Sequence, residues 1–469
     1  MQTIAIQPAR AAVPVVAPIV TDDPLADLEQ AVERTPSGQS IAPQDLARFH
    51  DATRGLFDDV EVEPQSILSE TPWRPLAASL VLQELLLAMQ RFELAVQLGE
   101  LLYASHPMDH RVQDSLFRAR WYRKAGRVAE HPGQELQGNF CPMLWKTVHV
   151  LPGGNVHSCC SVWMRTPIGN VFEQSVDEVW HGSQAQAVRQ SGVDGDYRFC
   201  GKISCPHIQR AAFDDNALSK SFWLKQAPAL PEGPARFNLS YDLSCNLSCP
   251  SCRKDMVVAK GPELDRIERA TDRIIDALRG AERVEVTGSG DPFASKSFRR
   301  LLQRINHDEF PRLRITIMSN GQLMRRSEWP KFEHLHGMID AVNISVDAAQ
   351  PETYRVLRRG GELDDLIPNL HFIGELRARG DITHYRLCFV VQQQNYREMA
   401  DFYELARQAG ADEVHYQMLH DWGTMPAAQL NRQRVHLAEH PEFPAFVECL
   451  KALPHEGKPR VLSDFSYLI

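Results

Sequence analysis

The chain has 469 residues, of which 43% are hydrophobic and 24% charged, a composition typical of a globular protein with about two to four domains. Its 51 basic and 60 acidic residues give a net charge of −9, which disfavours nucleic acid and acidic membrane surfaces as partners. No apolar run in the sequence reaches the length that is needed to span a membrane.

The N-terminal part is predicted to be a tail followed by helices. Residues 1–40 contain a short apolar stretch that is broken by proline and lacks the layout of a signal peptide, so we expect a mostly flexible tail. Residues 41–135 carry apolar side chains at helical spacing, and two similar turns, at 90–95 and 125–130, lie about 35 positions apart. This period resembles a tetratricopeptide repeat, whose groove would hold a peptide or a partner protein; a plain helical cap is the alternative.

The next segment, residues 138–215, contains two groups of cysteines. Four or five cysteines in two groups suit either an iron–sulfur cluster or a structural zinc site. Runs at 148–150 and 155–157 flank a Gly-Gly turn and predict a β-hairpin. The cysteines of this segment are Cys141, Cys159, Cys160, Cys200 and Cys205.

The C-x12-G-x4-C spacing that opens this segment, and the Gly-Asn-Val and Val-Trp runs that follow it, resemble the SPASM or twitch auxiliary-cluster domain. The resemblance implies one auxiliary [4Fe-4S] cluster, because the segment holds too few cysteines for two. The ligands that it implies are Cys141, Cys159, Cys200 and Cys205, with Cys160 as a rival for Cys159. Most relatives place this domain after a barrel domain, whereas here it comes first.

A Pro-rich linker at 226–234 precedes a second, tighter group of cysteines. Three thiolates with the spacing C-x3-C-x2-C hold three corners of a cubane cluster and leave the fourth iron open for chemistry. A zinc site would want a fourth close ligand, and partly buried free thiols are the remaining alternative. The three residues are Cys245, Cys249 and Cys252.

Six strand-like runs alternate with amphipathic helices after the linker, which predicts parallel βα units. About 50 residues remain after the sixth run, too few for two more units. The predicted fold class is therefore α/β, with an open (β/α)6 TIM-like partial barrel over 232–425, preceded by the Cys-rich and helical regions and followed by an extension over 426–469. The runs are 237–243, 283–287, 314–318, 341–346, 385–391 and 413–417.

Polar residues follow the predicted strands, at the carboxyl ends where ligands bind in such folds. A Gly-rich turn after the second strand exposes backbone polar groups to a ligand. Polar residues at the end of the fourth strand either contact a ligand or cap the strand. The planar guanidinium of a following arginine matches a carboxylate. The candidates are Gly288, Ser289, Gly290 and Asp291 in the turn, Ser345 and Asp347 at the strand end, and Arg358 or Arg359 after it.

The three-cysteine loop and the turns after it resemble the radical S-adenosylmethionine (SAM) superfamily. The resemblance implies a [4Fe-4S] cluster whose open iron chelates the amino and carboxylate groups of SAM. Reductive cleavage then gives a 5′-deoxyadenosyl radical, which abstracts a hydrogen atom from the substrate. Such clusters need a reducing compartment, so we expect no disulfides, a cytoplasmic location and a reducing partner such as flavodoxin or ferredoxin.

The resemblance also implies the SAM contacts. The turn at 288–291 matches the motif that binds the SAM amino group, with Ser289 in place of a glycine and Asp291 in place of a glutamate. Relatives contact the SAM ribose at positions that match Ser345 and Asp347, and they pair its carboxylate at a position that matches Arg358.

Two further side chains are candidates for catalysis. Cys388, on the fifth predicted strand, would return a hydrogen atom to a substrate radical if it faced the barrel interior; a small core residue is the alternative. Tyr416, on the sixth strand, is the second candidate, and its neighbour His415 is expected to be structural or to contact the substrate.

The predicted function is a radical SAM enzyme that crosslinks, oxidises or epimerises a peptide or protein. The alternative is a dehydrogenase or epimerase that acts on a small molecule, such as a sugar, a cyclitol or a natural-product intermediate. A third hypothesis, a non-enzymatic metal-binding scaffold, is disfavoured by the SAM-binding turns.

Overall fold

The computed structural model describes residues 76–107, 109–129, 135–136, 141–213, 232–286 and 289–468. The predicted tail, most of the linker and Gly288 lie outside the described residues. The chain divides into two compact units. One unit comprises residues 1–139 and 194–220, and the other comprises residues 140–193 and 221–469.

In its described part, the first unit consists of packed helices. Asp109 caps helix α6 (His110–Ala125), because its carboxylate accepts a hydrogen bond from the Arg111 backbone N–H at 2.9 Å. Gly126 ends the same helix with a φ of 66°, a conformation that glycine adopts at low cost. The helices are α4 (Leu76–Ala88), α5 (Phe92–Ser105), α6 (His110–Ala125) and α9 (Pro206–Phe213). The buried residues of one shared core are Leu87, Ala95, Val96, Ala119 and Tyr122.

The second unit is built on a sheet that has ten strands in the described residues, in the order β10-β9-β8-β7-β6-β5-β4-β1-β2-β3. Strands β1 and β4 to β10 run parallel to their neighbours, and β2 and β3 add an antiparallel edge. The strands are β1 (Thr147–Val150), β2 (Asn155–His157), β3 (Gly169–Asn170), β4 (Arg236–Leu239), β5 (Arg283–Val286), β6 (Arg314–Ser319), β7 (Ile339–Ser345), β8 (Ile382–Val390), β9 (Glu413–Gln417) and β10 (Arg460–Ser463).

The predicted hairpin and the six predicted strands are confirmed, but the count of six parallel strands is wrong. The hairpin strand β1 pairs with β4 in parallel, so it extends the barrel sheet at one end. At the other end, β10 pairs with β9. Strand β10 is only four residues long and none of its side chains is fully buried, so it lacks the apolar alternation that marks the other strands.

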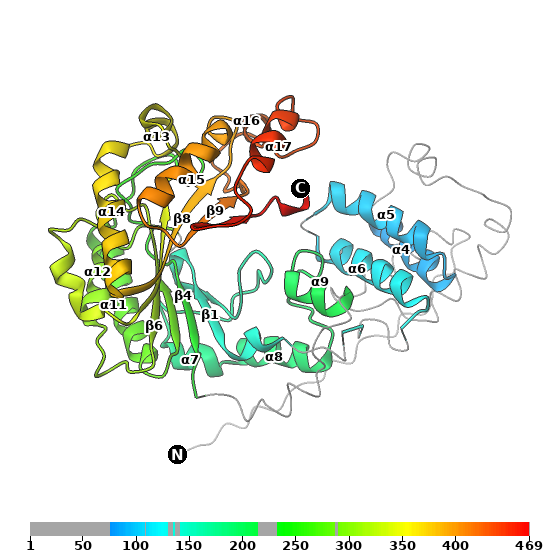
Figure 1. Ribbon diagram of the computed structural model, residues 1–469. Coiled ribbons are helices and arrows are strands. Elements are labelled where there is room, and N and C mark those ends of the chain that lie inside the picture. The colour runs from blue at the N-terminus through cyan, green and yellow to red at the C-terminus, as the bar shows by residue number, and fades with distance from the viewer. Residues whose placement is uncertain are drawn as a thin grey trace, which may run out of the picture. The chain divides into compact units, whose positions relative to one another are not determined.

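Helices cover one face of this sheet (Figure 1). The strand residues that face them are apolar and buried, as Ile315, Val342 and Leu387 show. Side chains that alternate with these carry polar groups on the opposite face, where Asn238 donates a 3.0 Å hydrogen bond to Glu285. The main helices of the unit are α7 (Val176–His181), α8 (Ser183–Asp194), α11 (Gly261–Leu278), α12 (Lys296–Arg304), α13 (Pro351–Leu357), α14 (Leu363–Arg379), α15 (Met399–Gln408), α16 (Ala427–Gln433) and α17 (Phe443–Lys451).

Short 3-10 helices complete the unit: Pro142–Trp145, Pro152–Gly154, Trp329–Leu335, Tyr396–Glu398 and Ser466–Leu468. Within the described ranges, none of the helices combines the length and the apolar character that a bilayer crossing requires.

Candidate functional site

The loop that follows β4 carries the three closely spaced cysteines. Cys245 and Cys249 are 7% and 6% exposed, whereas Cys252 is exposed. The Cys245 backbone N–H donates to the Val257 carbonyl at 2.8 Å, and the Cys252 N–H donates to the Cys249 carbonyl at 2.9 Å. The loop is therefore folded back on itself at the carboxyl end of the parallel strand, where sequence analysis places the cluster.

Each of the three sulfur atoms accepts a hydrogen bond from a different side chain. Asn320 Nδ2 lies 3.7 Å from the sulfur of Cys245, and Arg253 Nη2 lies 3.5 Å from that of Cys252. Arg358 Nη1 lies 3.8 Å from the Cys249 sulfur. Such donors stabilise negative charge on cysteine sulfur and tune the reduction potential of a cluster.

Arg253 and Asn320 are not predicted from the sequence as site residues. Because Arg253 directly follows the third cysteine, the sequence alone could have marked it as a residue beside the cluster. Asn320 lies in the Ser-Asn-Gly turn after β6, which the sequence marks only as a strand end.

Burial makes the free thiols of this loop hard to ionise. It raises the pKa of Cys245 to about 11, with the Asp291 carboxylate adding to the shift. Burial also raises the pKa of Cys249, and the Arg358 guanidinium opposes that shift. Because a metal binds the thiolate, cluster assembly must release these protons, and the nearby arginines favour that release.

The Gly-rich turn after β5 packs directly against the cysteine loop. A Cβ atom on Gly290 would lie 2.4 Å from the Asp242 carbonyl oxygen and 2.7 Å from that of Ser244, so only glycine fits at this point. The Asp291 N–H donates to the Ser244 carbonyl at 2.8 Å. Arg253 links the two segments, since its guanidinium donates to the Ser289 carbonyl as well as to the Leu243 carbonyl.

Asp291 ties this turn to the end of β6. Its buried carboxylate accepts hydrogen bonds from Ser319 Oγ at 2.7 Å and from the Asn320 N–H at 2.8 Å. The Phe293 N–H donates a third, at 3.0 Å. Burial raises the pKa of Asp291, and these donors oppose the shift. A contact from this turn to the SAM amino group would therefore use backbone carbonyls, because protein donors already occupy the carboxylate.

Two further predicted residues, Asp347 and Arg358, form a buried pair. Asp347 adopts a φ of 65°, and its carboxylate accepts from the Val390 N–H at 2.7 Å and pairs with Arg358 Nη2 at 2.7 Å. The Nε atom of Arg358 is buried, and it has no hydrogen-bond partner among the residues that the structure describes. A buried guanidinium N–H without an acceptor is costly, so the position favours an anionic ligand atom.

The other candidates around this pair lie as follows. Ser345 is half-buried at the end of β7, opposite Cys388 on β8. Arg359, the alternative to Arg358, is exposed and holds the outer side of the cysteine loop, since its Nε donates to Ser248 Oγ at 3.0 Å and its Nη2 to the Lys254 carbonyl.

The two catalytic candidates lie on opposite faces of the sheet. Cys388 is 2% exposed and alternates with Leu387 and Phe389, so it lies on the polar face with Arg386. Burial raises the pKa of its thiol to about 12. Tyr416 is fully buried among aromatic rings of the helix-covered face, and its hydroxyl donates to the Met399 carbonyl at 2.7 Å.

In this position Tyr416 packs in the hydrophobic core. Its predicted catalytic role stays a prediction. Its neighbour His415 lies on the polar face, where its Nε2 is 2.9 Å from a carboxylate oxygen of Asp464.

The predicted auxiliary cysteines belong to both units. The first unit, residues 1–139 and 194–220, is the helical unit, and the second, residues 140–193 and 221–469, is named the barrel unit after the predicted barrel. Cys141 precedes the first 3-10 helix, and Cys159 and Cys160 follow β2, all in the barrel unit. Cys200 and Cys205 belong to the helical unit and are 9% and 6% exposed. Their union in one site remains a prediction.

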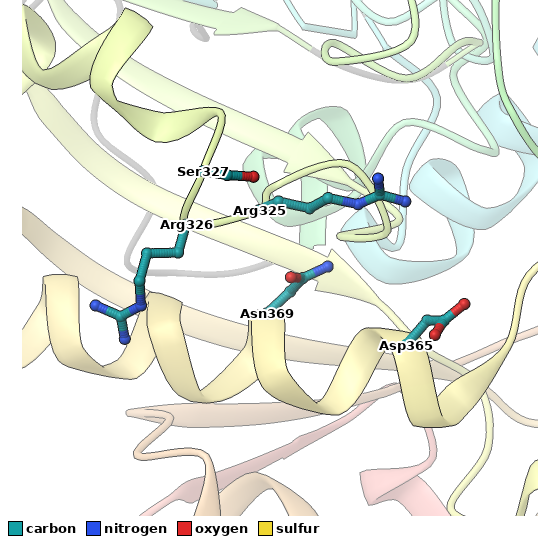
Figure 2. A pocket seen from close by; sticks show the side chains of 5 residues that line it. All are labelled: Arg325, Arg326, Ser327, Asp365 and Asn369. Carbon is teal, nitrogen blue, oxygen red and sulfur yellow. The ribbon is translucent and has the colours of Figure 1, made fainter.

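A cavity of about 700 Å3 lies beside the turn after β6 (Figure 2). Its polar side chains support that turn: Asn369 Nδ2 donates to the Gly321 carbonyl at 3.0 Å, and Arg325 Nε donates to the Gln322 carbonyl at 3.3 Å. Because the same turn carries Asn320, the cavity wall helps to fix the donor to Cys245. The lining residues are Arg325, Arg326, Ser327, Asp365 and Asn369.

The residues present fit a cluster with an open iron and a SAM molecule. The donor set is three cysteines on one loop, each with its own hydrogen-bond donor, and Arg358 offers an unused N–H. Across the described segments, no three Cys, His, Asp or Glu side chains converge as a site for a single metal ion.

A loop with three cysteines at the carboxyl edge of a parallel α/β sheet is the arrangement that the sequence predicts for a SAM-dependent iron–sulfur site. The sequence matches the family model of the radical SAM superfamily over residues 243–406, and an iron-sulfur cluster-binding domain, SPASM, over residues 141–206. The chain therefore contains a radical SAM domain and a SPASM domain. These domains imply a [4Fe-4S] cluster and SAM in the first and auxiliary iron–sulfur binding in the second.

Curated relatives match about a third of the chain. A probable GTP 3′,8-cyclase of Methanothermobacter marburgensis is 26% identical over 167 residues, which cover 36% of this chain and 52% of that protein. A GTP 3′,8-cyclase of Heliobacterium modesticaldum is 30% identical over 175 residues, 35% of this chain and 49% of that protein. The chain thus spans about half the length of the curated relatives it matches.

Solved structures align with part of the chain at low identity. The crystal structure of Streptococcus suis SuiB gives a TM-score of 0.33 at 18% identity, covering 50% of each chain. Native anSMEcpe with bound AdoMet gives a TM-score of 0.29 at 16% identity, covering 40% of this chain and 51% of that one.

Proposed function

We propose that this enzyme cleaves SAM reductively and abstracts a hydrogen atom from its substrate. The observation that carries the proposal is that the cysteine loop packs against the Gly290 turn and is contacted by the Asp347–Arg358 pair. When bound, the cluster and SAM supply a 5′-deoxyadenosyl radical. Cys245, Cys249 and Cys252 are the proposed cluster ligands, and Cys141, Cys159, Cys200 and Cys205 are proposed to hold an auxiliary [4Fe-4S] cluster.

The chain's own residues are proposed to orient SAM. The Arg358 guanidinium is held by Asp347 and presents its free N–H, which suits one oxygen of the SAM carboxylate. The Gly290 backbone carbonyl of the turn would accept a hydrogen bond from the SAM amino group. Ser345 and Asp347 are proposed to lie near the ribose. Fixed donors of this kind position the reacting bond without reorganisation.

For the substrate we propose a peptide or protein whose side chain is crosslinked, oxidised or epimerised. The helices of the first unit support this proposal, because α4 to α6 form an additional folded module that a small-molecule enzyme would not need for recognition. The electron for SAM cleavage is proposed to come from a reducing partner such as flavodoxin or ferredoxin, in a reducing compartment such as the cytoplasm.

The second candidate is a small polar molecule. The curated relatives are named for a reaction of GTP. The polar sheet face of this chain carries an amide and a carboxylate at Asn238 and Glu285, and the Arg386 guanidinium, which donates to Glu413. A substrate with several hydrogen-bonding groups suits such a face.

Metal analysis and SAM cleavage test the proposed function. The anaerobically reconstituted protein should bind about eight irons, and the Cys245→Ala, Cys249→Ala, Cys252→Ala variant about four, since each [4Fe-4S] cluster holds that number. With dithionite, the wild type should convert SAM to 5′-deoxyadenosine and methionine, and the variant should not. Absence of cleavage by fully loaded wild type would contradict the proposal. Four irons and one zinc in the wild type would make the auxiliary site structural.

The substrate class is tested by stimulation of SAM cleavage. GTP and the short peptides encoded by neighbouring genes are each incubated with the enzyme, and 5′-deoxyadenosine and new products are measured by mass spectrometry. Stimulation by a peptide, with a changed peptide mass, supports the first candidate. Stimulation by GTP alone would overturn it in favour of the second.

A further inference from the structure

A buried ion pair fixes the loop between Cys200 and Cys205 to helix α6. Lys202 Nζ lies 3.3 Å from the Asp114 carboxylate, and the two side chains are only 6% and 17% exposed. The same ammonium lies 5.9 Å from the centre of the Phe117 ring, on the next turn of α6. Among the ion pairs described within the helical unit, most are far more exposed; that of Arg123 with Glu93, for example, is 44% and 71% exposed.

The backbone of this loop is also fixed in place. The Cys205 N–H donates to the Gly201 carbonyl at 2.9 Å, which closes a turn, and the Lys202 carbonyl accepts from Gln209 Nε2 at 2.7 Å. Helix α9, which begins directly after Cys205, packs against α6. The two cysteines are therefore anchored on the helical unit by a charged side chain that lies between them in the sequence.

An ammonium buried to this degree is stable only beside its partner. Removal of one member of a buried pair leaves an uncompensated charge and forces the segment that carries it to move toward water. For Lys202, that movement would carry the flanking cysteine loop away from α6. A cluster binds only when its thiolates are correctly placed, so such a movement would lower the amount of bound iron.

We propose that the pair of Lys202 with Asp114 fixes the Cys200–Cys205 loop on the helical unit for ligation of the auxiliary cluster, which makes Lys202 a positioning residue. This assigns the helices a cluster-supporting role in addition to any role in substrate recognition. The inference rests on the proposed function, because it requires an auxiliary cluster on these cysteines.

The test uses the full chain with Cys245, Cys249 and Cys252 replaced by alanine, so that only auxiliary iron is counted. In this background, Asp114→Asn should lower bound iron from about four to less than half of that, and should alter the electron paramagnetic resonance signal of the reduced cluster. Asp114→Glu, which keeps the pair, should retain the iron. Glu93→Gln, which breaks the exposed Arg123 pair, is the matched control and should also retain it.

A second variant separates positioning from folding. Lys202→Met removes the ammonium and leaves a carboxylate that can reach solvent, so circular dichroism should show intact helices while iron is still lost. Full iron with an unchanged spectrum in both Asp114→Asn and Lys202→Met would overturn the inference. An iron-free background protein would instead overturn the proposed auxiliary cluster, which keeps the two failures distinct.

Discussion

At the scale of single residues, the most informative contact is the one between Arg358 and Asp347. The carboxylate fixes one nitrogen of the guanidinium at 2.7 Å, a second nitrogen points to the Cys249 sulfur, and the third has no partner in the described part of the chain. Sequence similarity assigns these two residues to different parts of SAM. The structure adds that they support each other, so substitution of either should disturb both contacts.

We therefore expect Arg358→Ala to weaken SAM binding by about 1–3 kcal/mol, or roughly 5- to 150-fold, because a charge-assisted contact is lost. Equilibrium binding to the reconstituted, oxidised enzyme measures the change. Arg359→Ala is the control, since Arg359 contacts Ser248 and Lys254 instead. An unchanged affinity in Arg358→Ala, with a loss in Arg359→Ala, would reverse the assignment of the two arginines.

Cys388 gives a prediction about reactivity. With a pKa of about 12, its thiol is only about 0.01% ionised at pH 8, and thiolate is the form that alkylates. In the native, cluster-loaded enzyme at pH 8, iodoacetamide should leave Cys388 unmodified, as mapped by peptide mass spectrometry. The half-buried Cys449 should react faster, and both should react in denaturant. Equal native rates at the two positions would contradict the buried placement, and with it the idea of a protected hydrogen-atom donor.

At the scale of elements, close packing of two turns builds the site. The Gly290 turn approaches the cysteine loop so closely that a methyl group at Gly290 would collide with two carbonyl oxygens. We expect Gly290→Ala to cost about 1–3 kcal/mol of strain, relieved by separation of the two turns. The variant should lose iron from the radical SAM cluster, with the auxiliary iron retained.

Gly280→Ala is the matched control for this change. A methyl group at Gly280 would meet no atom of the described residues within 4 Å, and the φ of this glycine is not positive. The control variant should keep all its iron and the thermal unfolding midpoint of the wild type. If Gly290→Ala also retained all its iron and cleaved SAM at the wild-type rate, the tight contact between the turns would not be needed for the cluster.

Elements with strong apolar alternation could be predicted from the sequence, and weaker ones could not. Ile315 and Ile317 on β6 alternate with half-buried neighbours, so the strand is marked by composition alone. The four-residue β10 has no such pattern and forms because β9 offers a free edge. The sulfur contact from Asn320 to Cys245 joins residues 75 positions apart and depends on how two loops fold together, which no spacing rule in the sequence encodes. The contact from Arg253 is to the adjacent Cys252, so its position in the sequence does mark it.

At the scale of the whole molecule, the division into two units leaves the proposed SAM site within one unit and divides the proposed auxiliary cysteines between both. All the proposed ligands of SAM and of its cluster lie within residues 245–358, in the barrel unit. Two of the four proposed auxiliary cysteines lie in the helical unit, on a segment that packs against α6. The order of motifs in the sequence does not predict this division, because residues 194–220 belong to the same unit as residues 1–139, from which they are separated in the sequence by part of the other unit.

This division leads to a prediction for a chain that begins at residue 136. It keeps every residue proposed for SAM cleavage, so it should retain about four irons and should cleave SAM without substrate at a rate near that of the full chain. It loses Asp114, which leaves Lys202 unpaired, and it uncovers the buried Ile208 of α9. We therefore expect loss of the auxiliary iron and lower solubility.

Iron analysis, 5′-deoxyadenosine formation and size-exclusion chromatography check the three parts of this prediction. Because truncation would remove auxiliary iron as well as any peptide groove, a substrate defect in the short chain would not by itself identify a recognition module. Surface substitutions on α5, such as Leu101→Asp at a 40% exposed position, separate the two roles. If the helices bind a peptide through this face, the variant should raise the substrate KM with all iron retained. Loss of SAM cleavage in the truncated chain would show that the barrel unit depends on the helices, contrary to the prediction.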